Sequence, residues 1–159
     1  PSPGEYLYEP SGAVVRAHLV QELAQELGAN LIDPHLAYLT AAEAVQSPLA
    51  QCYEVLEEIP VHEKQLKKWV RERGFTALTI KKRGVDLVPE KLRATLLAGG
   101  AGKKSGKKAA KNQGYNPATL VFTRVGSGQQ ARRIGWYVRP VDFSDAAQVS
   151  SSDTKNSVV

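Results

Sequence analysis

Residues 52–84, CYEVLEEIPVHEKQLKKWVRERGFTALTIKKRG, contain the pattern that decides the fold. The stretch 52–59 carries aromatic and β-branched side chains and is closed by Pro60, which predicts a strand. Residues 77–82 alternate between apolar and polar side chains, which predicts a second strand. The segment 63–73 between them has the spacing of an amphipathic helix. These residues therefore predict a strand–helix–strand unit.

The helix predicted over 63–73 has two distinct sides. At about 100° per residue, Leu66, Trp69 and Val70 fall on one side, which we expect to face the core. The opposite side is basic and consists of Lys64, Lys67, Lys68 and Arg71. Gly74 follows and suits the end of a helix.

Further elements follow this unit along the chain. Pro89 suits the first turn of a short helix, and residues 120–125 and 131–141 predict two strands joined through Gly126-Ser127-Gly128 as a hairpin. The order β-α-β-α-β-β indicates the α/β (α+β) class, with a mixed sheet covered by helices on one face. We expect the first two strands to be parallel neighbours or near neighbours through a right-handed crossover, and the last two to be antiparallel.

Residues 1–48 are predicted to form a helical lead-in that precedes this domain. Ser11 can cap a helix that begins near Ala13, and apolar residues recur at every fourth position until Gly28 ends it. Residues 49–143 form the predicted α/β domain. Within it, the lysine-rich, low-complexity stretch 99–117 is expected to be a flexible loop, and 144–159 a disordered tail.

Composition limits the classes of protein to which the chain can belong. The net charge of +5 favours an anionic partner over a neutral one. The single cysteine, Cys52, excludes an intrachain disulfide and fits a reducing cytoplasm, and the absence of a long apolar run indicates no membrane span. Because the chain starts at Pro1 and has no methionine, we expect a domain cut from a longer protein.

Sites for metals, cofactors and catalysis are not visible in the sequence. His18, His35 and His62 lack a ligand spacing, so no zinc site is predicted. No P-loop, GxSxG or GxGxxG pattern is present. Glu57 and Glu58 are adjacent in a strand and point to opposite faces, so they cannot share a substrate. We therefore predict no catalytic residue, no metal and no cofactor in these residues.

The most concentrated chemical signal is a cluster of cations at the exit of the second predicted strand. Lys81, Lys82 and Arg83 are followed by Gly84, which permits a tight turn or a close approach to a phosphate. Such groups bind nucleic-acid phosphates, because neutralising each phosphate releases counterions. Further candidate contacts are Arg124, Arg132, Arg133, Lys64, Lys68 and Arg71. The alternative is that these cations only make a solvated surface.

Several ordered motifs resemble a known family. They are YLYEPSGAVVRA (6–17), LIDPHLAYLT (31–40), EVLEEIP (54–60), TIKKRGVDLVPEKLR (79–93) and LVFTRVG (120–126). This series is similar to the THUMP-like domain at the C-terminus of a bacterial, largely actinobacterial, family of class I S-adenosylmethionine-dependent methyltransferases. The similarity spans residues 4–141, and the loop 99–117 departs from the family pattern.

The resemblance implies an RNA-binding accessory domain that positions RNA, either tRNA or rRNA, for a methyltransferase domain of the same parent chain. S-adenosylmethionine is then expected in that missing catalytic domain and not in this chain. A second hypothesis is a structural module that docks on the methyltransferase domain and stabilises it without contacting nucleic acid. A third is an enzyme that acts independently.

Overall fold

A computed structural model describes residues 1–2, 4–99 and 114–144. These residues form a mixed seven-stranded sheet with the order β2-β3-β1-β4-β7-β6-β5. Among the pairs of neighbouring strands, β5 and β6 are parallel and the others are antiparallel. The strands are β1 (Tyr6–Pro10), β2 (Asn30–Asp33), β3 (Leu36–Ala41), β4 (Ala50–Ile59), β5 (Ala77–Lys82), β6 (Pro117–Val125) and β7 (Arg132–Pro140).

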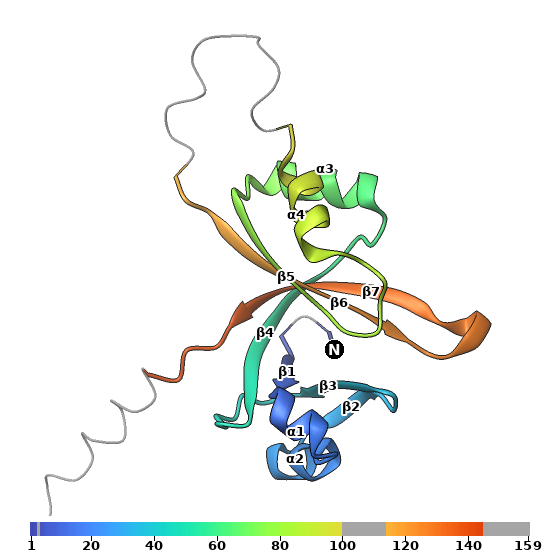
Figure 1. The fold of residues 1–159 in the computed structure, drawn as a ribbon. Helices are drawn as coiled ribbons and strands as arrows, with labels where there is room; N and C mark the ends of the chain where they lie inside the picture. The colour runs from blue at the N-terminus through green and yellow to red at the C-terminus, as the bar shows by residue number, and fades with distance from the viewer. Residues whose placement is uncertain (3, 100–113, 145–159) are drawn as a thin grey trace, which may run out of the picture.

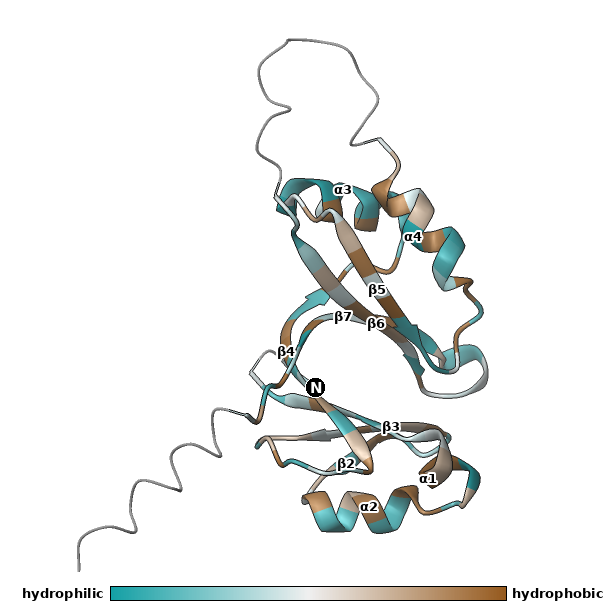
Figure 2. Cartoon of the chain, turned by 60° about the vertical axis from the view of Figure 1, so that its left-hand side comes forward, coloured by the Kyte–Doolittle hydropathy of each residue, from teal (hydrophilic) through white to brown (hydrophobic). Residues whose placement is uncertain are grey.

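Two pairs of helices lie at opposite ends of the molecule with the strands between them (Figure 1). They are α1 (Gly12–Arg16), α2 (Val20–Leu27), α3 (Glu63–Arg73) and α4 (Pro89–Leu97), and a short 3-10 turn covers Gly128–Gln130. Figure 2 shows hydrophilic residues over the outer side of α3 and hydrophobic residues along β5 beneath it. None of the helices formed by the described residues has the length and apolar character needed to cross a membrane.

The sheet has an N-terminal lobe, made of β1–β3 with α1 and α2, and a C-terminal lobe, made of β5–β7 with α3 and α4. A separate hydrophobic cluster lies under each pair of helices. A third cluster, with Tyr53, Val121 and Trp136 at its centre, lies between the lobes on the inner face of the sheet. Both pairs of helices therefore cover the outer face, and the two lobes share the inner one.

An irregularity in β4 makes this division possible. The register of β4 against β7 shifts between Val55 and Glu57. Val55 faces the cluster between the lobes, whereas Ile59 belongs to the cluster under α3 and α4. In a regular strand, residues four apart lie on the same face. The extra residue of the bulge therefore moves the later odd-numbered side chains from the inner face to the outer one.

Two close contacts join the tip of the β2–β3 hairpin to the C-terminal lobe. The buried carboxylate of Asp33 accepts a hydrogen bond from the backbone N–H of Gly126 at 2.9 Å. Gly84 has a φ of +68°, and a Cβ at this position would lie 2.5 Å from Leu36 Cδ2. The glycine predicted to permit a close approach therefore admits a leucine side chain of the N-terminal lobe.

The structure confirms the mixed α/β fold and the α3, β5 and α4 elements. The strands at 52–59 and 77–82 are parallel, but β7 and β6 lie between them in the sheet. Residues 13–28 form two helices and not one, because His18 adopts a φ of +58° and interrupts the helical path. The sequence patterns did not predict the strands β1–β3, which lie within residues 1–48, the segment expected to be a helical lead-in. The stretch 100–113 of the lysine-rich loop and the tail 145–159 lie outside the described residues.

The substitution Gly135→Ala tests how closely β7 packs against its neighbours in the sheet. A Cβ at Gly135 would lie 2.8 Å from Phe122 Cε1 and 3.1 Å from Ile59 Cγ1. Because both neighbours are buried, we expect Gly135→Ala to lower the free energy of unfolding by about 1–3 kcal/mol, the usual cost of overpacking a core. Urea denaturation measures this change. Gly114→Ala is the matched control, since nothing lies within 4 Å of its Cβ, and equal stability of the two variants would contradict the packing.

The hydrogen bonds of Asp33 predict that the joint between the lobes loses stability in acid. Hydrogen bonds from the backbone N–H groups of His35 and then Gly126 hold the pKa of Asp33 below its ordinary value. A carboxyl with a lowered pKa in the folded state stabilises the fold above its unfolded pKa, and this contribution disappears as the pH falls through the folded pKa. We expect unfolding titrations of Asp33→Asn to show a smaller loss of stability than the wild type as the pH falls below about 4. Identical pH profiles would contradict the assignment.

Candidate nucleic-acid interface

The run Lys81-Lys82-Arg83 is divided between the two faces of the sheet. Ile80 belongs to the cluster under α3 and α4, so Lys82, two residues later, lies on the same outer face. Lys81 and Arg83 lie on the inner face, because side chains two residues apart in a strand point the same way. Both are only partly exposed. The three cations therefore do not form one footprint.

Lys81 is engaged by the N-terminal lobe. Its Nζ atom lies 3.0 Å from Glu9 Oε1 and 5.8 Å from the centre of the Tyr53 ring. Burial works to lower the pKa of Lys81, but the hydrogen bond and the charge of Glu9 overcome this effect, so the pKa lies above its ordinary value. The amine is thus held in its charged form by a carboxylate.

Arg83 also contacts the N-terminal lobe. Its guanidinium donates a hydrogen bond to the Pro10 carbonyl at 3.1 Å and lies 5.4 Å from the centre of the Tyr38 ring. The Tyr38 hydroxyl donates to Glu9 Oε2 at 3.4 Å. Glu9, Tyr38, Lys81 and Arg83 thus form one network across the joint, which we call the interlobe clasp.

Three other predicted cations share the outer face of the C-terminal lobe, near the strand ends that contact the β2–β3 hairpin. Lys82 pairs with Phe122 across the β5–β6 ladder, and Arg124 lies directly opposite Arg133 in the β6–β7 ladder. Phe122 belongs to the outer cluster, and Arg124, two residues on, shares its face. We call Lys82, Arg124 and Arg133 the basic row. All three are exposed, and none makes an ion pair with another described residue.

The remaining predicted cations lie around this row or behind it. Arg132 is exposed, but its position beside Arg133 places it on the opposite face of β7. Lys64, Lys68 and Arg71 are exposed on α3. Of these, Lys68 lies 3.7 Å from Glu72, an exposed pair one helical turn apart that contributes little stability.

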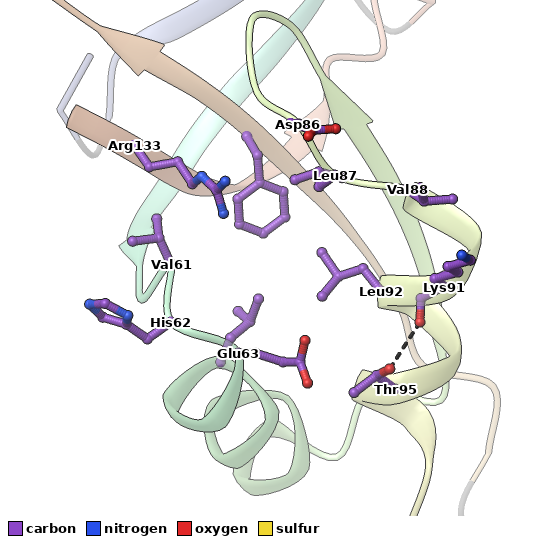
Figure 3. A pocket seen from close by; sticks show the side chains of 12 residues that line it. Val61, His62, Glu63, Asp86, Leu87, Val88, Lys91, Leu92, Thr95 and Arg133 are labelled. Atoms are coloured by element: carbon purple, nitrogen blue, oxygen red, sulfur yellow. Dashed lines mark hydrogen bonds between the residues drawn. The ribbon is translucent and has the colours of Figure 1, made fainter. Parts of the chain in front are cut away.

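A groove of about 460 Å³ opens on the outer face between α3 and α4 (Figure 3). Apolar walls come from Val61, Leu66, Leu87, Val88, Leu92 and Phe122. Its polar lining consists of His62, Glu63, Asp86, Lys91, Thr95 and Arg133. Arg133 therefore belongs both to the basic row and to the groove, and Figure 3 shows its guanidinium directed inward.

Sequence reasoning missed both the clasp partners and the groove. Glu9 and Tyr38 lie in strands β1 and β3, which were not predicted, so no signal placed them beside Lys81 and Arg83. The groove brings together four segments of the chain, and its lining could not be assembled without the topology. Within the described residues, no group of three or more His, Cys, Asp or Glu side chains is arranged to hold a metal ion.

Comparisons with known proteins identify a matching family and relatives that are similar over most of the chain. The model of the THUMP domain-like family matches residues 50–140. Two curated relatives from the CDC 1551 and H37Rv strains of Mycobacterium tuberculosis, both named uncharacterized S-adenosylmethionine-dependent methyltransferases, are 30% identical over 137 residues. The match covers 86% of this chain and 34% of each relative, so the chain spans about a third of their length.

A crystal structure of a putative methyltransferase from Porphyromonas gingivalis W83 shares the fold, with a TM-score of 0.61 at 20% identity. The match covers 89% of this chain and 30% of the chain in that crystal structure. The family match includes all of the C-terminal lobe together with β4, and it covers more than half of the sequence. The chain therefore belongs to the THUMP domain-like family.

Proposed function

We propose that this chain is the RNA-contacting accessory module of an S-adenosylmethionine-dependent methyltransferase, and that the basic row binds RNA phosphates. The observation that carries this proposal is the pairing of Arg124 directly opposite Arg133. Like charges opposite each other in a sheet are destabilising, and here no described carboxylate neutralises them. A bound polyanion removes that repulsion and gains affinity from it.

The clasp residues Lys81 and Arg83 have a different role in this proposal. A lysine already paired with Glu9 must break that ion pair before it can bind a phosphate, whereas no cation of the basic row is paired with a described carboxylate. Lys82 alone of the three consecutive cations contributes directly to the RNA surface. Lys64, Lys68 and Arg71 on α3 extend the positive surface on the same outer side.

Binding of S-adenosylmethionine and methyl transfer belong to the part of such an enzyme beyond this chain. The relatives named as methyltransferases are about three times as long as the matched region. The three strand-to-helix turns described here, β1–α1, β4–α3 and β5–α4, lack the GxGxxG pattern that holds a dinucleotide or a related cofactor.

A second candidate function is docking on the catalytic domain without contact to nucleic acid. It is favoured by exposed apolar side chains on the N-terminal lobe, where Leu19 and Leu49 are 48% and 42% exposed and line one shallow groove. Failure of the wild-type chain to bind RNA in the experiment below would leave docking as the remaining function.

Neutralising the basic row tests the RNA surface. We expect the triple change Lys82→Ala, Arg124→Ala and Arg133→Ala to raise the Kd for tRNA or an rRNA fragment about tenfold or more at low salt. The slope of log K against log salt should fall by up to about three, one for each phosphate contact removed. Fluorescence anisotropy over a salt series measures both quantities.

The matched control keeps the charge, with Lys82→Arg, Arg124→Lys and Arg133→Lys, and should retain most of the affinity. A second triple variant, Lys64→Ala, Lys68→Ala and Arg71→Ala, reports how far the surface extends along α3. If the neutral row variant bound RNA as tightly as the wild type with an unchanged salt slope, the proposed surface would be wrong.

Because Lys81 belongs to the interlobe clasp, we expect its substitution to lower stability and to leave RNA affinity nearly unchanged. Lys81→Ala leaves the partly buried Glu9 carboxylate without its charged partner, so we expect the free energy of unfolding to fall by about 1–3 kcal/mol. Urea denaturation measures this loss. The double variant Lys81→Ala with Glu9→Ala should lose less free energy of unfolding than the two single variants lose together. The Kd for RNA at a temperature where the variant is folded should change by less than about threefold. A large loss of affinity with stability intact would instead place Lys81 at the RNA.

A further inference from the structure

We propose that the groove between α3 and α4 holds one unpaired nucleotide of the RNA and prefers cytosine to uracil, because its rim presents carboxylates to the exocyclic amino group of the base. This inference rests on the proposed RNA-binding function and names a subsite within it. Three features of the groove support it: its size and apolar walls, the cation that it shares with the basic row, and two unpaired carboxylates.

The size and walls of the groove suit a flat, partly apolar group. Its volume of about 460 Å³ lies within the range of small-ligand sites, and the apolar side chains of α4 and the β5–α4 loop line it. Val88, one of the lining residues, is 48% exposed. Unpaired bases bind proteins by placing their rings against such surfaces, whereas paired bases keep theirs stacked in the helix.

The position of Arg133 joins the groove to the phosphate surface. Arg133 lines the groove and is also a member of the basic row, directly opposite Arg124. A nucleotide with its phosphate at Arg133 therefore has its base at the mouth of the groove, and the next phosphates along the strand meet Arg124 and Lys82.

The carboxylates Glu63 and Asp86 provide the basis for discrimination between bases. Both line the groove, both are exposed, and neither makes an ion pair with another described residue. Figure 3 shows the Glu63 carboxylate directed toward α4, across the space that a base would occupy. Carboxylates beside an RNA surface repel phosphates, and this cost is recovered only where they accept N–H donors. Cytosine presents an amino group at the position where uracil presents a carbonyl oxygen.

The experiment compares oligocytidine with oligouridine of equal length. The two have the same number of phosphates, so the counterion contribution is the same and the ratio of their Kd values isolates the base. We expect the wild type to bind the cytidine oligomer about fivefold more tightly, the effect of one hydrogen bond to a carboxylate at a solvated site.

Two variants assign this preference to the groove. Glu63→Gln with Asp86→Asn should bring the cytidine-to-uridine ratio close to one and should strengthen binding of both oligomers, because two negative charges are lost. The matched control is Glu22→Gln with Glu26→Gln on α2, which makes the same change of charge on the other lobe and should keep the ratio. Thr95→Phe fills the groove from the surface of α4 and should remove the ratio without changing the acidic side chains.

The outcomes separate this inference from the proposed function. Equal binding of the two oligomers by the wild type, or a ratio that survives both groove variants, overturns the nucleotide subsite while RNA binding by the basic row stands. Binding of neither oligomer, together with no binding of structured RNA, overturns both proposals.

Discussion

The ion pair between Lys81 and Glu9 joins the two lobes across the inner face of the sheet, beside the hydrophobic cluster that they share. It joins residues 72 positions apart in the sequence and lies on the inner face of a sheet whose two ends are bent toward each other. The bulge in β4 allows the bend, because it lets one strand present apolar side chains to the inner face along its first half and to the outer face along its second. With the bend closed, Tyr53 and Trp136 are fully buried between the lobes.

The strand alternation of β5 determines which charges are available to a partner. A run of three cations in a loop could all face a ligand, but in a strand every second side chain points the other way. Lys81 and Arg83 are therefore used within the fold, where a carboxylate, a carbonyl and two aromatic rings surround them. Lys82 faces outward. It forms the basic row together with Arg124 of β6 and Arg133 of β7. The outer face carries the three cations of the basic row, none of which pairs with a described carboxylate, so the electrostatic argument for an anionic partner applies to this face.

Local patterns in the sequence predicted the parts of the fold that are determined locally. The periodicity of Leu66, Trp69 and Val70 identified α3, and the alternation through Leu78 and Ile80 identified β5, because both patterns record burial by one neighbouring layer. The strands β1–β3 were missed because they are short and carry mixed side chains whose burial depends on both lobes. The same limit applied to the candidate site. The cation cluster was visible in the sequence, but Glu9 and Tyr38 became its partners only through pairings between distant strands, which residue patterns do not specify.

The boundaries of the family match and of the folding unit differ. The family model covers residues 50–140, whereas Glu9, Asp33, Leu36 and Tyr38 all lie before it. These four side chains cover the inner face of the sheet and hold the ends of β5 and β6 in place through Lys81, Gly84 and Gly126. The basic row is built on those same strand ends, next to the contacts made by the N-terminal lobe. A match that covers 86% of this chain in the mycobacterial relatives must include much of the N-terminal lobe, as expected if the two lobes act as one rigid platform for the charged face.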